Sequence, residues 1–457
     1  MSTLAETAET TTLAEGTLFR FATAGSVDDG KSTLVGRLLH DSKAILADQL
    51  DAVARTSEAR GFGGEKGGLD LALLTDGLRA EREQGITIDV AYRYFATDRR
   101  TFILADCPGH VQYTKNTVTG ASTADAVVLL IDARKGVLEQ TRRHLSVAAL
   151  LRVPHVVVAV NKIDLVDFSE PVFTAIADDV ARLASELGLR DAVAVPVSAL
   201  EGDNIVDRSD RTAWYAGPTL IELLESLPST DELGDRAEAF RFPVQTVIRP
   251  QGALAPGLDE AEFRDYRAYA GQVTEGVVRV GDRVSVVTPG QGARETTVVG
   301  IDVAGRALEE AAAPLSVALR LADEFDVARG DTIAAAGTLP ESTADLYGSL
   351  AWLSAKPLRE GAKVLVKHGT STVRGLVRAV TGKLDLDSFE VAPASELGLN
   401  DIGEVQIRLA APLPLEPYAA HRRTGAFLVI DPQDGNTLAA GMVRPHPGDT
   451  EDERYWI

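Results

Sequence analysis

The first half of the chain alternates short apolar runs with amphipathic stretches of helical length. The apolar runs predict β-strands at 18–24, 89–95, 101–106, 126–132, 155–161 and 192–196, and amphipathic stretches such as 31–39, 140–151 and 172–186 predict helices between them. Runs such as AVVLLI and VVVAV are apolar throughout, which is typical of strands covered on both faces. The pattern predicts a doubly wound α/β domain with a mostly parallel sheet.

The pattern changes in the second half, where strands are short and turns frequent from Phe240 onward. The segment VVRVGDRVSVV (277–287) predicts a tight hairpin, because Gly281 can take the positive φ that such a turn requires. Two consecutive all-β modules of this kind are typical of small barrels. We therefore predict a disordered leader at 1–17, the α/β domain at 18–236, one β-barrel domain at 237–340, and another with a C-terminal tail at 341–457.

The composition narrows the class of protein. Hydrophobic residues make up 45% and charged residues 25% of the 457, which is ordinary for a globular protein. No apolar run approaches the roughly 18 residues that span a bilayer, so we expect no membrane association. The acidic N-terminal segment resembles neither a signal peptide nor a transit peptide, and the single cysteine excludes an intramolecular disulfide. We expect a cytoplasmic protein.

The charge balance bears on partners. Lys+Arg 46 against Asp+Glu 67 leaves a net charge of −21, whereas phosphate contacts require a basic surface, so we expect no nucleic-acid partner. The clusters Arg142-Arg143-His144 and Arg422-Arg423 are predicted to be solvated charges or partner contacts.

A phosphate-binding motif follows the first predicted strand and opens a predicted helix. Residues 25–32, GSVDDGKS, fit the pattern G-x-x-x-x-G-K-S, in which backbone amides and the helix N-terminus favour a phosphate anion. Lys31 would act in catalysis by reaching the β- and γ-phosphates, and the Ser32 hydroxyl would ligate Mg²⁺. The nucleotide-binding residues predicted here are Gly25, Ser26, Val27, Asp28, Asp29, Gly30, Lys31, Ser32 and Thr33. We expect the Asp29 carboxylate to point away from the nucleotide.

A second motif, DCPGH at 106–110, ends the predicted strand 101–106. Asp106 can hold Mg²⁺ through water, and the Gly109 amide can sense the γ-phosphate. A lone histidine after a strand is more often structural, but His110 directly follows D-x-P-G, so we predict that it orients the attacking water or stabilises developing charge. Cys107 is predicted to be a small buried residue rather than a reactive thiol, and with Pro108 it completes this part of the site.

Two further motifs predict which base is bound. A carboxylate in N-K-x-D can accept hydrogen bonds from the ring N–H and the exocyclic amine of guanine, and adenine offers no such pair. The S-A-L triplet can add a backbone donor to the guanine oxygen. The residues concerned are Asn161, Lys162, Ile163 and Asp164, followed by Ser198, Ala199 and Leu200. The α/β domain is therefore predicted to be a P-loop GTPase domain with GTP and Mg²⁺ as its ligands.

A long piece from 41 to 85 separates the first helix from the second strand, and loops of that length are usually functional or mobile. Thr87 lies where this piece returns to the sheet. A hydroxyl there can meet both Mg²⁺ and the γ-phosphate, so we assign Thr87 a catalytic and metal-binding role. The alternative is a β-branched residue that begins a strand.

Together, GSVDDGKST, AEREQGITID, DCPGH, NKID and SAL resemble the translation-factor class of GTPases, and the two predicted barrels resemble domains 2 and 3 of elongation factor Tu. Within that class, the segments 27–45, 70–95, 131–144 and 213–227 look like the large GTPase subunit of bacterial sulfate adenylyltransferase. The resemblance runs from Leu18 to near Arg444. The double aspartate that includes Asp29 is one feature that points to this branch.

The resemblance implies a heteromeric enzyme, a heterodimer or higher, that makes adenosine 5′-phosphosulfate and pyrophosphate from ATP and sulfate. GTP hydrolysis on this subunit would drive that uphill transfer on a smaller catalytic subunit. The sequence has no second P-loop, no S-G-G-x-D-S loop and no H-x-x-H pair, which fits such a division of labour and argues against a fused adenylylsulfate kinase. The alternatives are an elongation factor that delivers aminoacyl-tRNA, or a regulatory GTPase switch.

Overall fold

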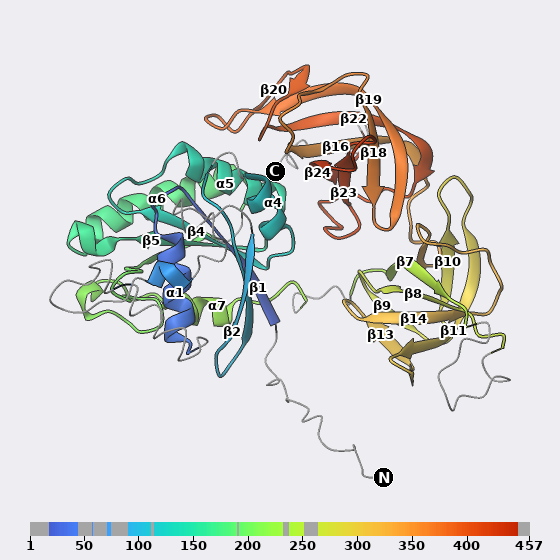
Figure 1. Ribbon diagram of the computed structural model, residues 1–457, viewed down its shortest axis with the longest axis horizontal. Helices are drawn as coiled ribbons and strands as arrows, with labels where there is room; N and C mark the ends of the chain where they lie inside the picture. The colour runs from blue at the N-terminus through green and yellow to red at the C-terminus, as the bar shows by residue number, and fades with distance from the viewer. Residues whose placement is uncertain are drawn as a thin grey trace, which may run out of the picture. The chain divides into compact units, whose positions relative to one another are not determined.

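The computed structural model describes residues 18–43, 57, 71–74, 90–110, 114–189, 192–231, 237–250 and 264–446. The chain folds into two compact units, Met1–Ser229 and Thr230–Ile457 (Figure 1). None of the helices in these ranges combines the length and the apolar character that a membrane crossing requires.

The first unit is built on a six-stranded sheet with the order β2-β3-β1-β4-β5-β6. All neighbouring pairs are parallel except β2 with β3, so the predicted mostly parallel α/β sheet is confirmed. Its described elements are β1 Leu18–Gly25, α1 Lys31–Asp41, the 3₁₀ helix η2 Leu71–Leu74, β2 Ala91–Ala96, β3 Thr101–Asp106, α4 Thr114–Ser122, β4 Ala126–Asp132, α5 Glu139–Leu150, β5 His155–Asn161, η4 Ile163–Val166, α6 Glu170–Glu186, β6 Ala192–Pro196, η5 Asp210–Thr212 and α7 Leu220–Ser226.

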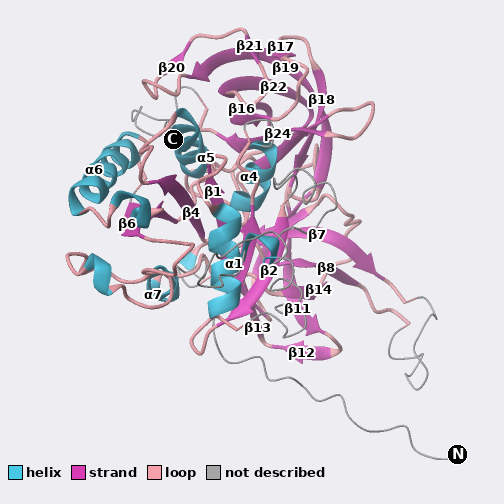
Figure 2. Cartoon of the chain, turned by 60° about the vertical axis from the view of Figure 1, so that its left-hand side comes forward, coloured by secondary structure: helices cyan, strands magenta, loops and turns pink. Residues whose placement is uncertain are grey.

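Side-chain alternation along β1 explains why helices cover both faces of this sheet. Phe21 lies in a buried cluster with Leu38 of α1 and Leu220 of α7. The next residue, Ala22, faces the other way, where a Cβ placed on Gly120 of α4 would lie 3.8 Å from the Ala22 Cβ. Figure 1 and Figure 2 both show α5 and α6 on one side of the sheet and α7 on the other.

The second unit contains two closed barrels, as predicted. One has the strand order β10-β15-β7-β8-β14-β11 and is closed by β10 pairing with β11; the other has the order β18-β23-β24-β16-β22-β19 and is closed by β18 pairing with β19. The strands of the first barrel and its extensions are β7 Arg241–Ile248, β8 Ala268–Gln272, β9 Val277–Arg279, β10 Arg283–Val287, β11 Arg294–Val303, β12 Arg306–Leu308, β13 Glu310–Ala312, β14 Ser316–Leu321 and β15 Thr332–Ala335. Those of the second are β16 Thr343–Trp352, β17 Leu358–Arg359, β18 Lys363–His368, β19 Ser371–Leu384, β20 Val391–Ala392, β21 Glu396–Leu397, β22 Ile402–Leu413, β23 Ala426–Ile430 and β24 Thr437–Val443.

The predicted hairpin at 277–287 is wrong, although its turn exists. Gly281 has φ 97°, and the Asp282 amide donates to the Arg279 carbonyl at 3.1 Å. The two flanking strands do not pair with each other, because β9 pairs with β13, and β10 pairs with β11 and β15. Val278 of β9 is buried opposite Ala311 of β13. The turn residues fix the local reversal but not the partner of each strand.

A buried ion pair joins the two barrels of the second unit. The Arg241 guanidinium, at the start of β7, donates to both carboxylate oxygens of Glu416, with a shortest distance of 2.7 Å. Both side chains are almost fully buried. Thr424 donates to Glu416 at 2.7 Å, and the His421 ring lies 2.8 Å from a carboxylate oxygen of Glu275. The charge of Arg241 is therefore matched inside the unit.

Close packing also brings η2 onto α1. Leu71 is buried, and its carbonyl oxygen lies only 2.1 Å from the position that a Cβ on Gly36 of α1 would occupy. Only a glycine at position 36 allows this approach.

Candidate functional site

The phosphate-loop motif lies between β1 and α1, as the sequence predicts. The Lys31 ammonium is buried and donates to the carbonyls of Gly25 at 2.9 Å and Ser26 at 2.7 Å. Burial lowers the pKa of Lys31. Gly30 has φ 95°, and a Cβ there would lie 2.4 Å from the Asn161 side-chain nitrogen. A buried cation inside a turn that admits only glycine forms a compact anion site.

Asp29 is buried within this loop. One of its carboxylate oxygens accepts a 2.7 Å hydrogen bond from the Ser26 amide, so the side chain turns back on its own loop. Its other oxygen and the Ser26 hydroxyl have no hydrogen-bond partner among the described residues. Burial raises the pKa of Asp29, and the nearby charge of Lys31 acts in the opposite direction. Two buried polar atoms of the loop thus remain available to a ligand or to water.

The DCPGH motif meets the phosphate loop at the end of β3. Thr23 of β1 donates to the Asp106 carboxylate at 3.0 Å and accepts from the Cys107 amide at 3.3 Å. A Cβ on Gly109 would lie 2.3 Å from the Lys31 ammonium nitrogen, so the backbone at Gly109 contacts that side chain directly. His110 follows and is half-buried, and Pro108 is buried.

Cys107 is fully buried, and burial raises the pKa of its thiol. The prediction that Cys107 is a small buried residue is confirmed.

Asn161, at the end of β5, links the phosphate loop to the S-A-L triplet. Its side-chain nitrogen donates to the Asp29 carbonyl at 2.7 Å, and its side-chain oxygen accepts from the Ala199 amide at 2.9 Å. Ile163 is fully buried behind it, and Asp164 is half-buried in η4. The N-K-x-D motif thus holds the two loops at a fixed spacing.

Lys162 is positioned by a residue that the sequence reasoning missed. Its ammonium lies 3.2 Å from the Asp132 carboxylate and also donates to the Asp28 carbonyl. Burial acts to raise the pKa of Asp132, but hydrogen bonds from Arg134 and Lys162 outweigh burial and hold that pKa well below its usual range. Asp132 is the last residue of β4 and lies opposite Asn161 in the β4–β5 register. An acidic residue at the end of the strand next to β5 was therefore the sequence signal for a partner of Lys162.

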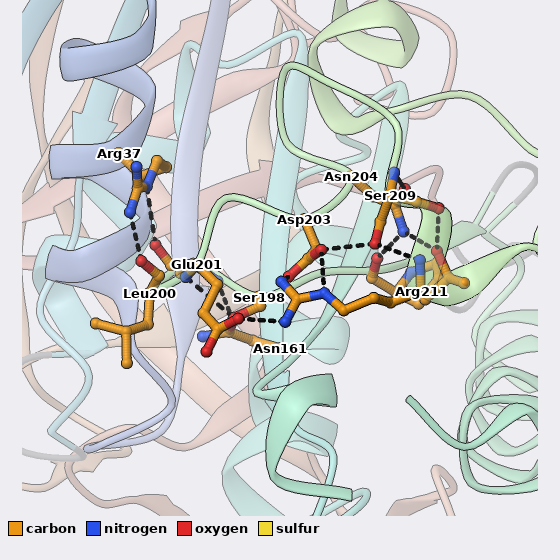
Figure 3. Close-up of polar contacts among 12 residues, drawn as sticks. Arg37, Asn161, Ser198, Leu200, Glu201, Asp203, Asn204, Ser209 and Arg211 are labelled. Atoms are coloured by element: carbon orange, nitrogen blue, oxygen red, sulfur yellow. Dashed lines mark hydrogen bonds and ion pairs between the residues drawn. The ribbon is translucent and has the colours of Figure 1, made fainter. Parts of the chain in front are cut away.

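The S-A-L triplet forms a tight turn between two arginines (Figure 3). The Gly202 amide donates to the Ser198 carbonyl at 2.8 Å, and the Glu201 amide donates to the Ser198 hydroxyl at 3.2 Å. Arg211 pairs with Glu201 and Asp203 on one side. On the other side Arg37 donates to the carbonyls of Ala199 and Leu200.

The structure brings together most of the predicted site residues but not all. The phosphate loop, 106–110, Asn161, Lys162 and 198–200 are connected by the contacts given above. Within the described part of the chain, the Asp164 carboxylate makes no hydrogen bond or ion pair to them, and Thr87 lies outside the described residues. Val27, Ser32 and Thr33 are half-buried, and Asp28 is exposed with φ 68°.

The prediction that His144 is a solvated charge or partner contact is wrong. It lies on α5 with Thr141, Leu145 and Ala148, which the helical period places on the same buried face. Burial lowers the pKa of His144 to about 3, so its ring is neutral. The apolar residues at this spacing were the signal that the sequence reasoning missed.

Comparisons with known proteins agree with this geometry. Residues 17–230 match the family described as the elongation factor Tu GTP binding domain, and residues 346–444 match the GTP-eEF1A C-terminal domain-like family. A sulfate adenylyltransferase subunit 1 from Sulfurovum sp. is 46% identical over 93% of this chain and 87% of the relative, and one from Cellvibrio japonicus is 47% identical over 93% and 86%. A bifunctional enzyme CysN/CysC from Mycobacterium tuberculosis is 48% identical, over 93% of this chain and 67% of the relative.

Proposed function

This chain belongs to the sulfate adenylyltransferase subunit 1 family of elongation factor Tu-like GTPases. We propose that it binds and hydrolyses GTP as one subunit of a heteromeric sulfate adenylyltransferase. The observation that carries the proposal is a sequence identity of 46–48% over 93% of the chain to the relatives named sulfate adenylyltransferase subunit 1 and bifunctional enzyme CysN/CysC. The family-model match over residues 17–230 includes the phosphate loop and the N-K-x-D motif, and the match over 346–444 falls within the second barrel.

The phosphate end of the site supports a triphosphate. Lys31 is buried and makes its hydrogen bonds to carbonyls of its own loop, partners that a phosphate oxygen can replace. Gly30 and Gly109 leave no room for a Cβ beside Asn161 and Lys31, so the backbone itself lines the cradle. The donor set therefore fits a nucleotide phosphate chain.

The base end supports guanine. Asp164 would accept from the guanine ring N–H and amine, and the Lys162 stem would lie along the base. The Ala199 amide already donates to Asn161, and among the described residues the Leu200 amide makes no hydrogen bond, so Leu200 would supply the donor to the guanine 6-oxygen. Each such charge-assisted bond contributes about 1.5–3 kcal/mol.

The metal end supports Mg²⁺. Ser32 opens α1, Asp106 ends β3 beside Thr23, and both offer the oxygen ligands that Mg²⁺ prefers. With Thr87 they would hold the ion, which would supply positive charge to offset the negative charge of the phosphates.

In the hydrolytic step, a water oxygen attacks the γ-phosphorus, the bond to the bridging oxygen breaks, and GDP and phosphate leave. His110 would orient that water, since it directly follows Gly109, whose backbone contacts Lys31. The Gly109 amide would donate to the γ-phosphate, so the conformation of the residues that follow Gly109 would depend on whether that phosphate is present.

The adenylyl transfer would take place on a smaller partner subunit. There, a sulfate oxygen attacks the α-phosphorus of ATP, the bond to pyrophosphate breaks, and adenosine 5′-phosphosulfate forms. This transfer is uphill, and GTP hydrolysis here would supply the driving force. The lack of a second P-loop in this sequence supports the division of labour.

The test is the GTPase rate of the purified chain, alone and with the small catalytic subunit of a sulfate adenylyltransferase, ATP and sulfate. We expect strong stimulation only in the full mixture, and phosphosulfate formation that stops when GTP is replaced by GDP. An Asp164→Asn variant in the same complex is the matched control, because it should lose both activities with GTP. A GTPase rate indifferent to all three additions would overturn the coupled enzyme and favour a translation factor or a regulatory switch.

A further inference from the structure

Arg37 connects the helix that follows the phosphate loop with the loop that would meet the base. It lies on α1, and its Nε donates to the Ala199 carbonyl at 3.2 Å while its Nη2 donates to the Leu200 carbonyl. The Arg37 side chain is only 18% exposed. Figure 3 shows it reaching from its helix toward Leu200. A planar guanidinium that donates to two successive carbonyls fixes their direction as well as their position.

This direction decides where one amide points. In a trans peptide the carbonyl of one residue and the N–H of the next lie in one plane and point in opposite directions. Because Arg37 holds the Ala199 carbonyl, the Leu200 N–H faces away from Arg37. The preceding amide, that of Ala199, already donates to Asn161 at 2.9 Å. Among the described residues, the Leu200 amide is the donor that the triplet has left.

The rest of the turn is held independently of Arg37. The Ser198 amide donates to the Asp203 carbonyl at 3.2 Å, and Asp203 accepts from Arg211. Gly202 has φ 93°, and a Cβ placed on it would lie 3.8 Å from the Arg37 guanidinium, so this end of the turn lies beside Arg37 without depending on a hydrogen bond from it. Removing Arg37 should therefore release the 199–200 peptide while the ends of the turn stay in place.

We propose that Arg37 is a positioning residue for base recognition: it orients the Ala199–Leu200 peptide so that the Leu200 amide donates to the guanine 6-oxygen. The same contact couples the base-binding loop to the helix that begins with Lys31 and Ser32. The inference rests on the proposed GTP site and adds to it a residue that touches neither the base nor the phosphates.

The experiment measures equilibrium binding of GTP, inosine triphosphate and 6-thioguanosine triphosphate to wild type and Arg37→Ala. Inosine keeps the 6-oxygen but lacks the amine that Asp164 would read, and the thio analogue keeps the amine and ring N–H but has a weak acceptor at position 6. We expect Arg37→Ala to weaken GTP and inosine triphosphate in parallel, roughly 3- to 10-fold, and to change the thio analogue by less than about twofold.

Two further variants separate positioning from folding. Arg37→Lys keeps the charge but cannot hold two carbonyls in one plane, so its loss should be intermediate and again confined to the 6-oxo nucleotides. Arg182→Ala removes an exposed arginine of α6 that pairs with Asp179 and Glu186, and it should change no affinity. Thermal unfolding of each variant checks that the fold is retained.

The outcomes are distinct. If Arg37→Ala and Arg37→Lys lose affinity equally for all three nucleotides, Arg37 is a structural residue. That outcome would overturn this inference but leave the proposed GTP site intact. A wild type that does not prefer GTP to ATP would overturn the proposed GTP site, and the inference with it.

Discussion

The Asn161 side chain donates to the Asp29 carbonyl at 2.7 Å, so a residue of the N-K-x-D motif directly supports the phosphate loop. The same side chain accepts from the Ala199 amide at 2.9 Å. A single amide group therefore sets the spacing between the two loops that would grip the ends of one nucleotide. The position of the phosphate loop therefore depends on that of the S-A-L loop through Asn161.

Asn161→Ala should weaken GTP and GDP alike. The substitution removes two buried hydrogen bonds, each with a net contribution of about 0.5–1.5 kcal/mol, so we expect a loss of roughly 5- to 150-fold. Titration with a fluorescent GDP analogue measures it, and Asn436→Ala, in an exposed turn of the second barrel, is the control. Retained affinity in Asn161→Ala would show that the two loops hold their spacing without this bridge.

Asp164→Asn should change base preference rather than abolish binding. The carboxylate would accept two hydrogen bonds from guanine, whereas the amide of asparagine can donate to the extra oxygen of xanthine. We expect GTP affinity to fall roughly 100-fold or more while xanthosine triphosphate affinity rises. Competition binding with both nucleotides measures this, and unchanged affinities for the two would remove Asp164 from the base site.

His110→Ala should slow hydrolysis far more than binding. A residue that orients the attacking water stabilises the transition state, and such groups typically raise the rate by roughly 10²- to 10⁴-fold. Single-turnover GTP hydrolysis and GTP affinity are measured on the same preparation. Parallel losses in rate and affinity would identify His110 as a binding or structural residue.

Glu416→Gln should destabilise the second unit in a pH-dependent way. Burial acts to raise the pKa of Glu416, but hydrogen bonds from Arg241 and Thr424 outweigh it and lower the pKa. Because the folded pKa is the lower one, the contribution of Glu416 is present above the usual value of about 4.3 and is lost as pH falls through the folded pKa. At pH 7 we expect the variant to lose about 3 kcal/mol, since Arg241 stays buried without its charged partner.

Chemical unfolding of wild type and Glu416→Gln across pH 3–7, taken as roughly the range that spans carboxylate titration, checks this prediction. The difference between the two proteins in free energy of unfolding should shrink as the pH falls below the usual pKa of Glu. The neighbouring Glu275 has a pKa raised by burial and faces His421, and both groups are present in each protein. The exposed Glu295, which pairs with Arg283, supplies the control Glu295→Gln, expected to cost under about 1 kcal/mol. A pH-independent difference would assign the loss to packing.

The sequence predicted the sheet of the first unit well because its signals are local. Apolar runs covered on both faces mark β4 and β5, and the predicted bounds 126–132 and 155–161 agree with the structure. The phosphate loop was found because its spacing, strand and helix all lie within one short segment. These signals need no knowledge of distant residues.

The features that the sequence did not predict depend on contacts between distant parts of the chain. Arg37 and Leu200 are 163 positions apart, and nothing in their neighbourhoods announces the contact. The pairing of β9 with β13 forms a separate two-stranded sheet between segments that are distant in the sequence, whereas the turn at Gly281 is local. His144 was misread because its two arginine neighbours suggested an exposed stretch, while the face of the helix determined its burial.

Gly36 shows that a nucleotide-binding domain can constrain residues that touch no nucleotide. The Leu71 carbonyl fills the space of a Cβ at position 36, so even alanine would push η2 off α1. We expect this glycine to be inherited unchanged as the surrounding helix diverges, because any other side chain at that position would require the Leu71 backbone to move in the same step.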